Sequence, residues 1–199
     1  MDPDPIELRA LGCLIEKQRT TPDAYPLTLN SLRLACNQST NRDPVVEYDE
    51  AEIRAALERL GRRGWIRMAS WGGRAVKYRH LLDEALGLSR EQVALLAVLM
   101  LRGPQTPGEL KGRSDRLQGF ASLGEVERTL GELVERGLVR RHERRPGQKE
   151  QRYEQMLGGD AASEEAPASA AAAPEPEGLE ERIARLEREV AELRAWIED

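Results

Sequence analysis

The chain is poor in the residue types that usually carry catalysis, metal binding or membrane insertion. Aromatic residues make up only 4% of its 199 residues, and there are two cysteines and two histidines. Two cysteines do not make a disulfide framework, and without a Cys/His cluster we expect no structural zinc site. The longest apolar run, residues 93–101, covers nine positions, whereas a membrane-spanning helix needs roughly 20. We therefore expect a cytoplasmic, globular protein without a membrane segment.

The sequence also lacks a recognisable catalytic centre. Cys13 and Cys36 lie in apolar segments, as is typical of inert core thiols. His80 and His142 are isolated, with no triad or metal-ligand spacing around them. No glycine-rich phosphate loop or dinucleotide motif is present. The sequence predicts a protein that is not an enzyme and that holds no metal or cofactor.

Charge is unevenly distributed along the chain. The formal net charge is −5, but residues 1–157 carry a balance of +3 and residues 158–199 a balance of −8. Only four of the 30 basic residues are lysine. Arginine suits phosphate recognition, although so uniform a bias can equally reflect codon usage. The body of the chain is mildly basic and its C-terminal part is acidic.

A repeat of roughly 75 residues runs through the body of the chain. The helical pattern at 52–60, followed by Gly64, returns 73 residues later at 125–133, followed by Gly137. A period of that length indicates a duplicated domain rather than a solenoid unit. The dipeptides that also correspond are Thr21-Pro22 with Thr106-Pro107, and Lys77-Tyr78 with Arg152-Tyr153.

Each copy shows the same order of predicted elements. An apolar helix is followed by a Thr-Pro turn and a second helix, expected at about 28–36 and 107–117. The third helix begins at a capping box and ends at a glycine, and a β-hairpin completes the unit. The capping boxes are Asp49 with Glu52 and Ser122 with Glu125. Three helices followed by a hairpin are typical of a winged helix-turn-helix domain.

The predicted fold is therefore mainly α with small β-hairpins. It comprises two tandem winged helix-turn-helix domains and a C-terminal coiled-coil helix. The predicted boundaries are 1–84 for the first domain, 85–157 for the second, 158–178 for a disordered Ala/Pro/Glu linker and 179–199 for the coiled coil.

The first hairpin can be predicted in register. Apolar alternation pairs Met68 with Val76 and Ile66 with Tyr78, with all four facing the core. This pairing implies a three-residue loop centred on Gly72. It also leaves Arg67 opposite Lys77 on the outer face.

Several short motifs resemble the YceH family of bacterial proteins. The resemblance covers roughly residues 6–157 and implies tandem winged-helix domains. It implies no activity, because the family is one of unknown function. The residues after 157 lie outside it. The matching motifs are Glu16-Lys17, Thr21-Pro22, Tyr25-Pro26-Leu27, Cys36-Asn37-Gln38, Thr40-Asn41-Arg42, Pro44-Val45, the stretch 101–110, Pro146-Gly147 and Arg152-Tyr153.

The C-terminal segment predicts self-association. After the linker, apolar residues recur at alternating spacings of four and three, which is the seam of a coiled coil. β-Branched residues at a and leucines at d favour a parallel homodimer. An antiparallel pair, or packing of this helix on the body of its own chain, would use the same face. The seam residues are Leu179, Ile183, Leu186, Val190, Leu193 and Ile197.

Charges on the third helices and the hairpins point to different surfaces for DNA. The third helices begin with carboxylates, which would repel phosphates in the major groove. The hairpins are basic and could hold the DNA backbone. Alternatively, their arginines pair with the acidic helices or tail. The candidate residues are Arg67, Arg74, Lys77, Arg140, Arg141, Arg144, Arg145, Lys149 and Arg152.

A polar loop at 37–48 separates the second and third helices of the first copy. It offers Asn37, Gln38, Asn41 and Arg42 to a ligand, a base or a partner. The alternative is that these side chains bind nearby backbone and shape the loop.

Together these features predict a self-associating, DNA-binding or regulatory protein that contacts the backbone of double-stranded DNA through basic wings. The alternative is a protein–protein adaptor that uses the winged-helix surfaces and binds no nucleic acid. The acidic third helices and the apolar helix at 93–101 favour this second interpretation.

Overall fold

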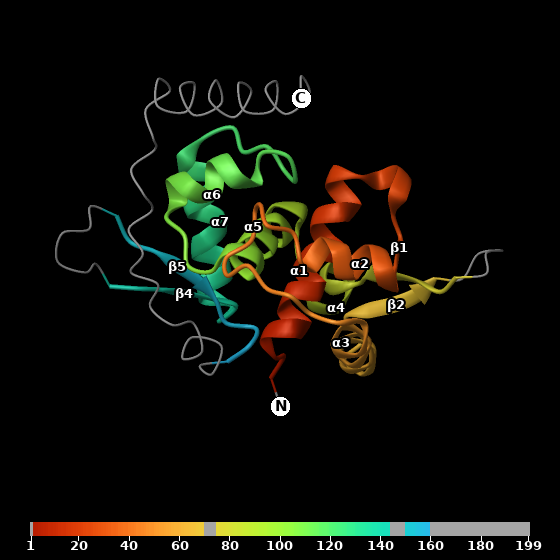
Figure 1. The fold of residues 1–199 in the computed structure, drawn as a ribbon. Coiled ribbons are helices and arrows are strands. Elements are labelled where there is room, and N and C mark those ends of the chain that lie inside the picture. Colours follow the sequence, from red (N-terminus) through yellow and green to blue (C-terminus); the bar gives the residue numbers. More distant parts are fainter. Residues whose placement is uncertain (1, 70–74, 144–149, 160–199) are drawn as a thin grey trace, which may run out of the picture. The chain divides into compact units, whose positions relative to one another are not determined.

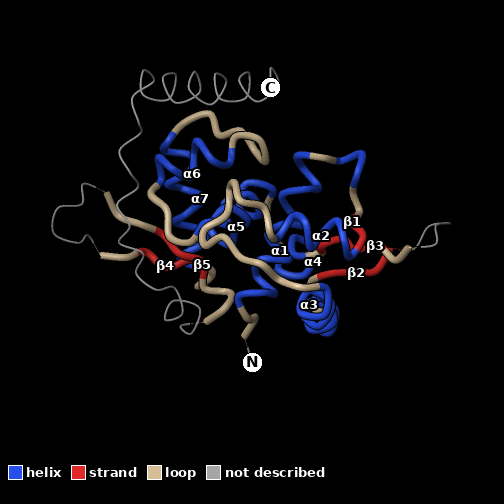
Figure 2. The backbone as a smooth tube through the Cα atoms, viewed as in Figure 1, coloured by secondary structure: helices blue, strands red, loops and turns tan. Residues whose placement is uncertain are grey.

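The computed structural model describes residues 2–69, 75–143 and 150–159 (Figure 1, Figure 2). The helices within these ranges are α1 (Pro5–Thr20), the 3-10 turn η1 (Pro22–Ala24), α2 (Leu29–Cys36), α3 (Glu50–Arg62), α4 (Leu82–Leu86), α5 (Arg90–Arg102), α6 (Pro107–Ser114) and α7 (Leu123–Glu135). The strands are β1 (Leu27–Thr28), β2 (Ile66–Ala69), β3 (Lys77–His80), β4 (Val139–Arg141) and β5 (Tyr153–Gln155). The strands form two antiparallel sheets, ordered β1-β3-β2 and β4-β5.

The order of elements recurs as the repeat predicts. Helices α1, α2 and α3 precede the β2–β3 hairpin, and helices α5, α6 and α7 precede the β4–β5 hairpin. The third helices, α3 and α7, each have 13 residues. This mixed α/β arrangement is compatible with winged helices. The division into two domains at residue 84 stays a prediction.

The ends of the third helices follow largely from local sequence. The Asp49 carboxylate accepts from the Glu52 amide, and Glu52 accepts from the Asp49 amide, so the predicted capping box is confirmed. In α7 only half of the box forms, because Glu125 accepts from the amide before the cap, that of Ala121. Both terminating glycines have the left-handed backbone that a C-cap requires, at φ +74° and +68°.

One predicted correspondence between the copies is wrong. Thr106 caps α6, and its counterpart in the first half is Thr28, which caps α2. Thr21 instead follows α1, where its hydroxyl donates to the Lys17 carbonyl, and it precedes η1. An N-cap residue is defined by the helix that follows it, for which its side-chain oxygen accepts a backbone hydrogen bond. The similarity of two Thr-Pro dipeptides does not show where that helix begins.

The predicted register of the first hairpin is also wrong, by two residues. Ile66 pairs with His80, and Met68 pairs with Tyr78. His80 takes the buried place beside Ile66 because its amide donates to the Tyr25 hydroxyl, at 2.8 Å, and its ring contacts the Gln18 side chain. A shift of two residues preserves the faces of a strand, but it pushes the outer end of the hairpin away from the core. Met68 is consequently 67% exposed rather than buried.

One continuous core joins the two halves. Every residue of α5 from Gln92 to Leu101 is buried, and the largest contact that α5 makes is with α1, beside which it lies in Figure 1. Gly12 permits this approach, because a Cβ at that position would lie 3.0 Å from Leu101 Cγ. The apolar character of α5 is thus explained mainly by packing against the first half of the chain.

No helix in the described ranges is long and apolar enough to cross a membrane. The predicted coiled-coil seam, from Leu179 to Ile197, lies outside the described residues, as does the linker from residue 160 onward.

Candidate functional site

The first hairpin presents unpaired cations. Arg67 and Lys77 are exposed, and neither side chain makes a hydrogen bond or an ion pair with the described residues. In the observed register Arg67 lies opposite Arg79, so the expected pairing of Arg67 with Lys77 is replaced by two arginines side by side. Arg79 forms an ion pair with Glu84, at 3.6 Å. Arg74, at the tip, lies outside the described residues.

The second hairpin is partly committed to the protein itself. Arg141 is exposed and Arg140 is half-buried. Arg152 donates to the Pro104 carbonyl at 2.8 Å and pairs with Glu109 at 3.1 Å, so it fixes the hairpin to α6. Its partner belongs to a second helix, not to the acidic third helices or the tail that the alternative interpretation names. Three predicted residues, Arg144, Arg145 and Lys149, lie outside the described residues.

The third helices keep their carboxylates in solvent. Glu50, Glu52 and Glu58 are exposed on α3, and Glu127 and Glu135 are exposed on α7. A surface of this sign repels phosphate groups. The acidic faces therefore stay separate from any DNA-binding surface that the hairpins form.

The loop at 37–48 is held by side chains that turn inward. The Arg42 side chain is fully buried and donates to both carboxylate oxygens of Glu16, at 2.6 and 3.1 Å, and to the Ala35 carbonyl. Burial opposes its charge, but the bonds to Glu16 outweigh that cost and raise the pKa of Arg42. Gln38 accepts another bond from the same guanidinium, at 3.0 Å. Two of the predicted loop residues thus shape the loop.

The other two polar residues of this loop differ in role. The Asn37 side chain donates to the Tyr48 carbonyl and accepts from the Tyr48 amide, at 2.8 and 2.9 Å, so it closes the loop. Asn41 has a left-handed backbone, φ +62°, and is exposed. Its side-chain oxygen accepts a bond from Arg102 of α5. Asn41 also lines a pocket.

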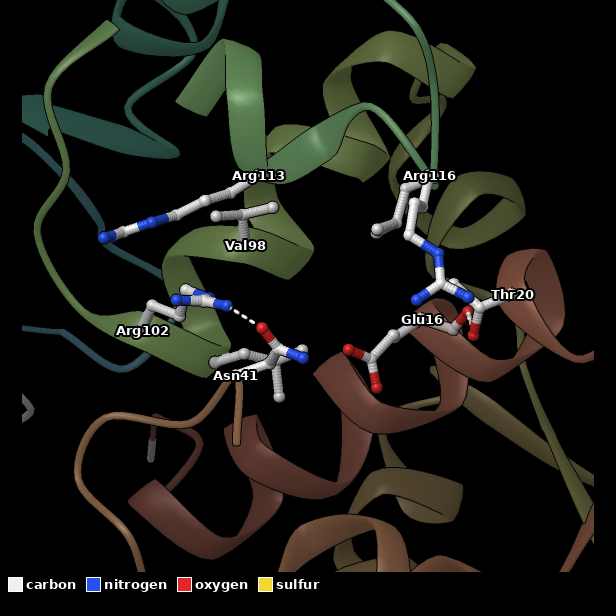
Figure 3. Close-up of a pocket in the computed structure, with 9 residues that line it drawn as sticks. Glu16, Thr20, Asn41, Val98, Arg102, Arg113 and Arg116 are labelled. Atoms are coloured by element: carbon white, nitrogen blue, oxygen red, sulfur yellow. Dashed lines mark hydrogen bonds between the residues drawn. The ribbon is translucent and has the colours of Figure 1, made fainter. Parts of the chain in front are cut away.

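That pocket was not predicted. It has a volume of about 70 Å³ and lies between α1, Asn41 and the segment from α5 to the end of α6. Its apolar lining consists of Val98, Leu101 and Leu117. In Figure 3 the Arg102 guanidinium lies on one side of it and the Arg116 guanidinium on the other, while the Arg113 side chain extends away from Arg116. The remaining lining residues are Glu16, Thr20 and Asn41.

The arginines of the pocket are poorly neutralised by the protein. Among the described residues Arg116 has no hydrogen bond or ion pair, and Arg113 has only Glu109, at 3.6 Å. Arg102 bonds to a neutral amide oxygen. Burial, together with the positive charges of Arg113 and Arg42, lowers the pKa of Arg102. The pocket therefore carries an excess of positive charge, which Glu16, Asp43 and Glu109 offset only in part.

Sequence reasoning could not assemble this site. Arg102, Arg113 and Arg116 lie on two successive helical segments and look like ordinary surface arginines. Only the packing of α5 on α1 brings them opposite Glu16 and Thr20. The distinctive signal was the loop motif that contains Asn41, and it named one residue of the lining.

A buried ionic cluster was also not predicted, and neither was the contact between the two cysteines, although their burial was. Glu7 accepts from Arg59 and Arg63 at 3.0 and 3.2 Å and from the Asp4 amide. Burial alone would raise the pKa of Glu7, but these donors outweigh it and lower that pKa. The two cysteines are free and buried, and the pKa of the Cys36 thiol is raised by its contact with the other thiol and by burial. Within the described residues no cluster of His, Cys, Asp or Glu could hold a metal ion.

Comparison with known proteins places the chain in a family. The family described as "Protein of unknown function, DUF480" matches residues 4–148. A UPF0502 protein of Geotalea uraniireducens is 48% identical over 198 residues, which cover 96% of this chain and 89% of the relative. The chain belongs to the DUF480/UPF0502 family. UPF0502 proteins of Pelobacter propionicus and Geobacter sulfurreducens are 50% and 49% identical, each over 94% of this chain and 88% of the relative.

These relatives correct one expectation. A match over 96% of a 199-residue chain necessarily runs past residue 157, so the likeness to UPF0502 proteins is not confined to residues 6–157. The motifs that carry the resemblance all lie before residue 157, and short motifs do not show how far along the chain relatives remain similar.

Proposed function

We propose that this UPF0502 protein is a self-associating DNA-binding protein, not an enzyme, whose two halves are winged helices that hold the duplex by its phosphate backbone. The observation that carries the proposal is the pair Arg67 and Lys77, which are exposed on the β2–β3 hairpin without an anionic partner. Arg141 on the β4–β5 hairpin is exposed in the same way. Basic side chains of this kind position a protein on DNA without reading its sequence.

The acidic third helices set the mode of binding. Carboxylates exposed along α3 and α7 disfavour insertion of either helix into the major groove. Binding is therefore expected to be independent of sequence and strongly dependent on salt, because it releases counterions from the duplex.

Fluorescence anisotropy of a random duplex, titrated with the full chain at several salt concentrations, tests this proposal. The variant Arg67→Glu/Lys77→Glu is expected to weaken binding at least about tenfold and to flatten the salt dependence by roughly two phosphate contacts. The control Arg54→Glu changes an exposed arginine of α3 and should bind as the parent does. Equal affinities for the hairpin variant and the parent would remove the proposed surface.

Self-association is proposed to come from the heptad seam at Leu179–Ile197. A dimer would join two DNA-binding bodies and increase avidity without new contacts. Replacing Ile183 and Val190 with Asp in the full chain places charge at two a positions. Sedimentation should then show the loss of the dimer, and an unchanged mass would put the contacts elsewhere.

A second function, docking of another protein, is favoured by one observation. Met68 and Val76 are 67% and 46% exposed on the hairpin that carries the unpaired cations. Exposed apolar side chains rimmed by charges are typical of protein-binding surfaces. If the full chain shows no saturable duplex binding at low salt, this function replaces the first. A partner captured by the parent and lost by Met68→Asp would then support it.

A further inference from the structure

We propose that the pocket between α1 and the α5–α6 segment binds the phosphate group of a small molecule. Arg102, Arg113 and Arg116 line an opening of about 70 Å³, with the guanidinium groups of Arg102 and Arg116 on opposite sides of it (Figure 3). A single water needs roughly 10–15 Å³ of such volume, so there is room for one tetrahedral oxyanion. This ligand site is separate from the hairpins and does not depend on whether they bind DNA.

The charge of the lining favours an anion even though a carboxylate is present. Glu16 projects toward the pocket in Figure 3, but both of its oxygens accept bonds from the buried Arg42. That pair neutralises itself on the α1 side of the pocket. The charges of Arg102, Arg113 and Arg116 remain, and Glu109, at 3.6 Å from Arg113, offsets only part of them.

The donors suit a phosphate better than a carboxylate. A guanidinium is a planar fork that pairs with two oxygens at once. Guanidinium groups on two sides of the opening can share the three terminal oxygens of a phosphate, whereas a carboxylate has only two. Asn41 adds a further donor, because its amide oxygen is occupied by Arg102 while its amide nitrogen has no partner among the described residues.

The apolar residues of the lining indicate that the phosphate belongs to a small molecule. Val98, Leu101 and Leu117 line the same opening and offer no hydrogen bonds to a sugar-phosphate chain. They would pack instead against a compact organic group attached to the phosphate. The same ligand would connect α1 with α5 and α6, so binding should also stabilise the contact between the two halves.

Isothermal titration calorimetry of the full chain with inorganic phosphate, at constant ionic strength, tests this site. The parent is expected to show one saturable site, and its melting temperature should rise with phosphate. Arg116→Gln should weaken binding about tenfold, because it removes a charge-assisted hydrogen bond to the ligand. Arg113→Gln should weaken binding less, because it removes a positive charge beside the opening. Both side chains are exposed at α6 and just after it, so folding should be unaffected. Arg54→Gln is the matched control and should bind as the parent does.

A second arm separates free phosphates from the DNA backbone. Glycerol phosphate, a phosphomonoester, should bind at least as tightly as inorganic phosphate, and an added duplex should not displace it. The proposal is overturned if the parent shows no saturable phosphate binding, or if the variants bind phosphate as the parent does. It is also overturned if the two arginine variants lose only duplex binding, since the pocket would then be part of a DNA surface.

Discussion

The two halves of the body share an order of elements but are stabilised by different means. The first half buries charged side chains, namely Arg9, Arg42 and Glu7, each less than 7% exposed. In the second half the corresponding first helix, α5, is buried along ten consecutive residues, nine of them apolar. Two halves with the same order of elements therefore need not be stabilised in the same way. The free energy of burying a charged side chain depends on its partners, whereas that of burying a leucine depends mainly on the apolar area removed from water.

The connection between the second and third helices shows this difference most clearly. In the first half it runs from Asn37 to Asp49 and is filled by the Arg42 guanidinium. In the second half the shorter connection between α6 and α7 contains Phe120, which is buried. The longer loop also reaches the other half, since the Asp43 amide donates to the Leu101 carbonyl at 2.9 Å. The longer, polar loop is thus part of the contact between the halves.

The largest expected effect is the loss of the buried ion pair in the first half. Arg42→Ala should lower the free energy of unfolding by about 3 kcal/mol, because it leaves Glu16 and the Ala35 carbonyl without their partner. Urea unfolding measures this change. Arg128→Ala, which breaks the exposed pair with Glu132 in the second half, should cost at most about 0.5 kcal/mol. Equal losses would contradict the contrast between the halves.

Acid should destabilise the first half through His80. Burial lowers the pKa of His80 from 6.5 to about 4. As the pH falls below 6.5, the unfolded chain takes up a proton that the folded chain refuses, so stability decreases. The loss should be about 2 kcal/mol between pH 7 and pH 5.

Denaturant unfolding at several pH values checks this prediction. In His80→Gln the side-chain amide can still donate to Gln18, and the decline in the free energy of unfolding between pH 7 and pH 5 should be much smaller. The Glu7 carboxylate, whose pKa is lowered, adds its own loss only at more acidic pH, below its ordinary value of 4.5. An unchanged slope in the variant would show that His80 is not the group responsible.

The close approach of α1 and α5 can be tested by substituting Gly12, with a glycine of α7 as the control. Gly12→Ala would place a Cβ at 3.0 Å from Leu101, and we expect a net loss of about 1 kcal/mol, since overpacking exceeds the gain in helix propensity. Gly131→Ala on α7 meets nothing within 4 Å and should stabilise the protein by up to about 1 kcal/mol. Thermal unfolding of both variants decides between them. If both variants stabilise, the helices have room to separate.

The smallest expected effect concerns the caps of the third helices. Asp49→Ala and Ser122→Ala should each cost about 1 kcal/mol, because each leaves the third helical amide without its acceptor. The two losses in the free energy of unfolding should differ by less than about 1 kcal/mol, although the capping box is reciprocal in α3 and half-formed in α7. A cost for one cap alone would mean that only one of the two helices needs its cap.

Much of the local structure could be predicted from the sequence. The length and the caps of α3 and α7 follow from residues that are neighbours in the chain, and the helices appear where the apolar spacing indicates. The hairpin register could not be predicted, because it is set by His80 contacting Gln18 and Tyr25, which lie more than 50 residues away. Periodicity contains no information about such contacts.

The functional residues show the same limit. A polar loop predicts exposure, so the burial of Arg42 follows only from its distant partner Glu16. The pocket depends on which face of α5 turns to α1, a choice that a helix apolar on every side leaves open. The exposure of Arg67 and Lys77, by contrast, was predictable from alternation along the strand and survives the two-residue shift.

The close contact of α1 with α5 at Gly12 has a consequence for the stability of each half on its own. Apolar residues of each half cover an apolar surface of the other half that would otherwise be exposed to water. Proteolytic cleavage between α4 and α5 would therefore produce fragments with exposed, leucine-rich surfaces that aggregate, rather than two soluble fragments. We expect the body to unfold in one cooperative transition, without separate calorimetric transitions for its two halves.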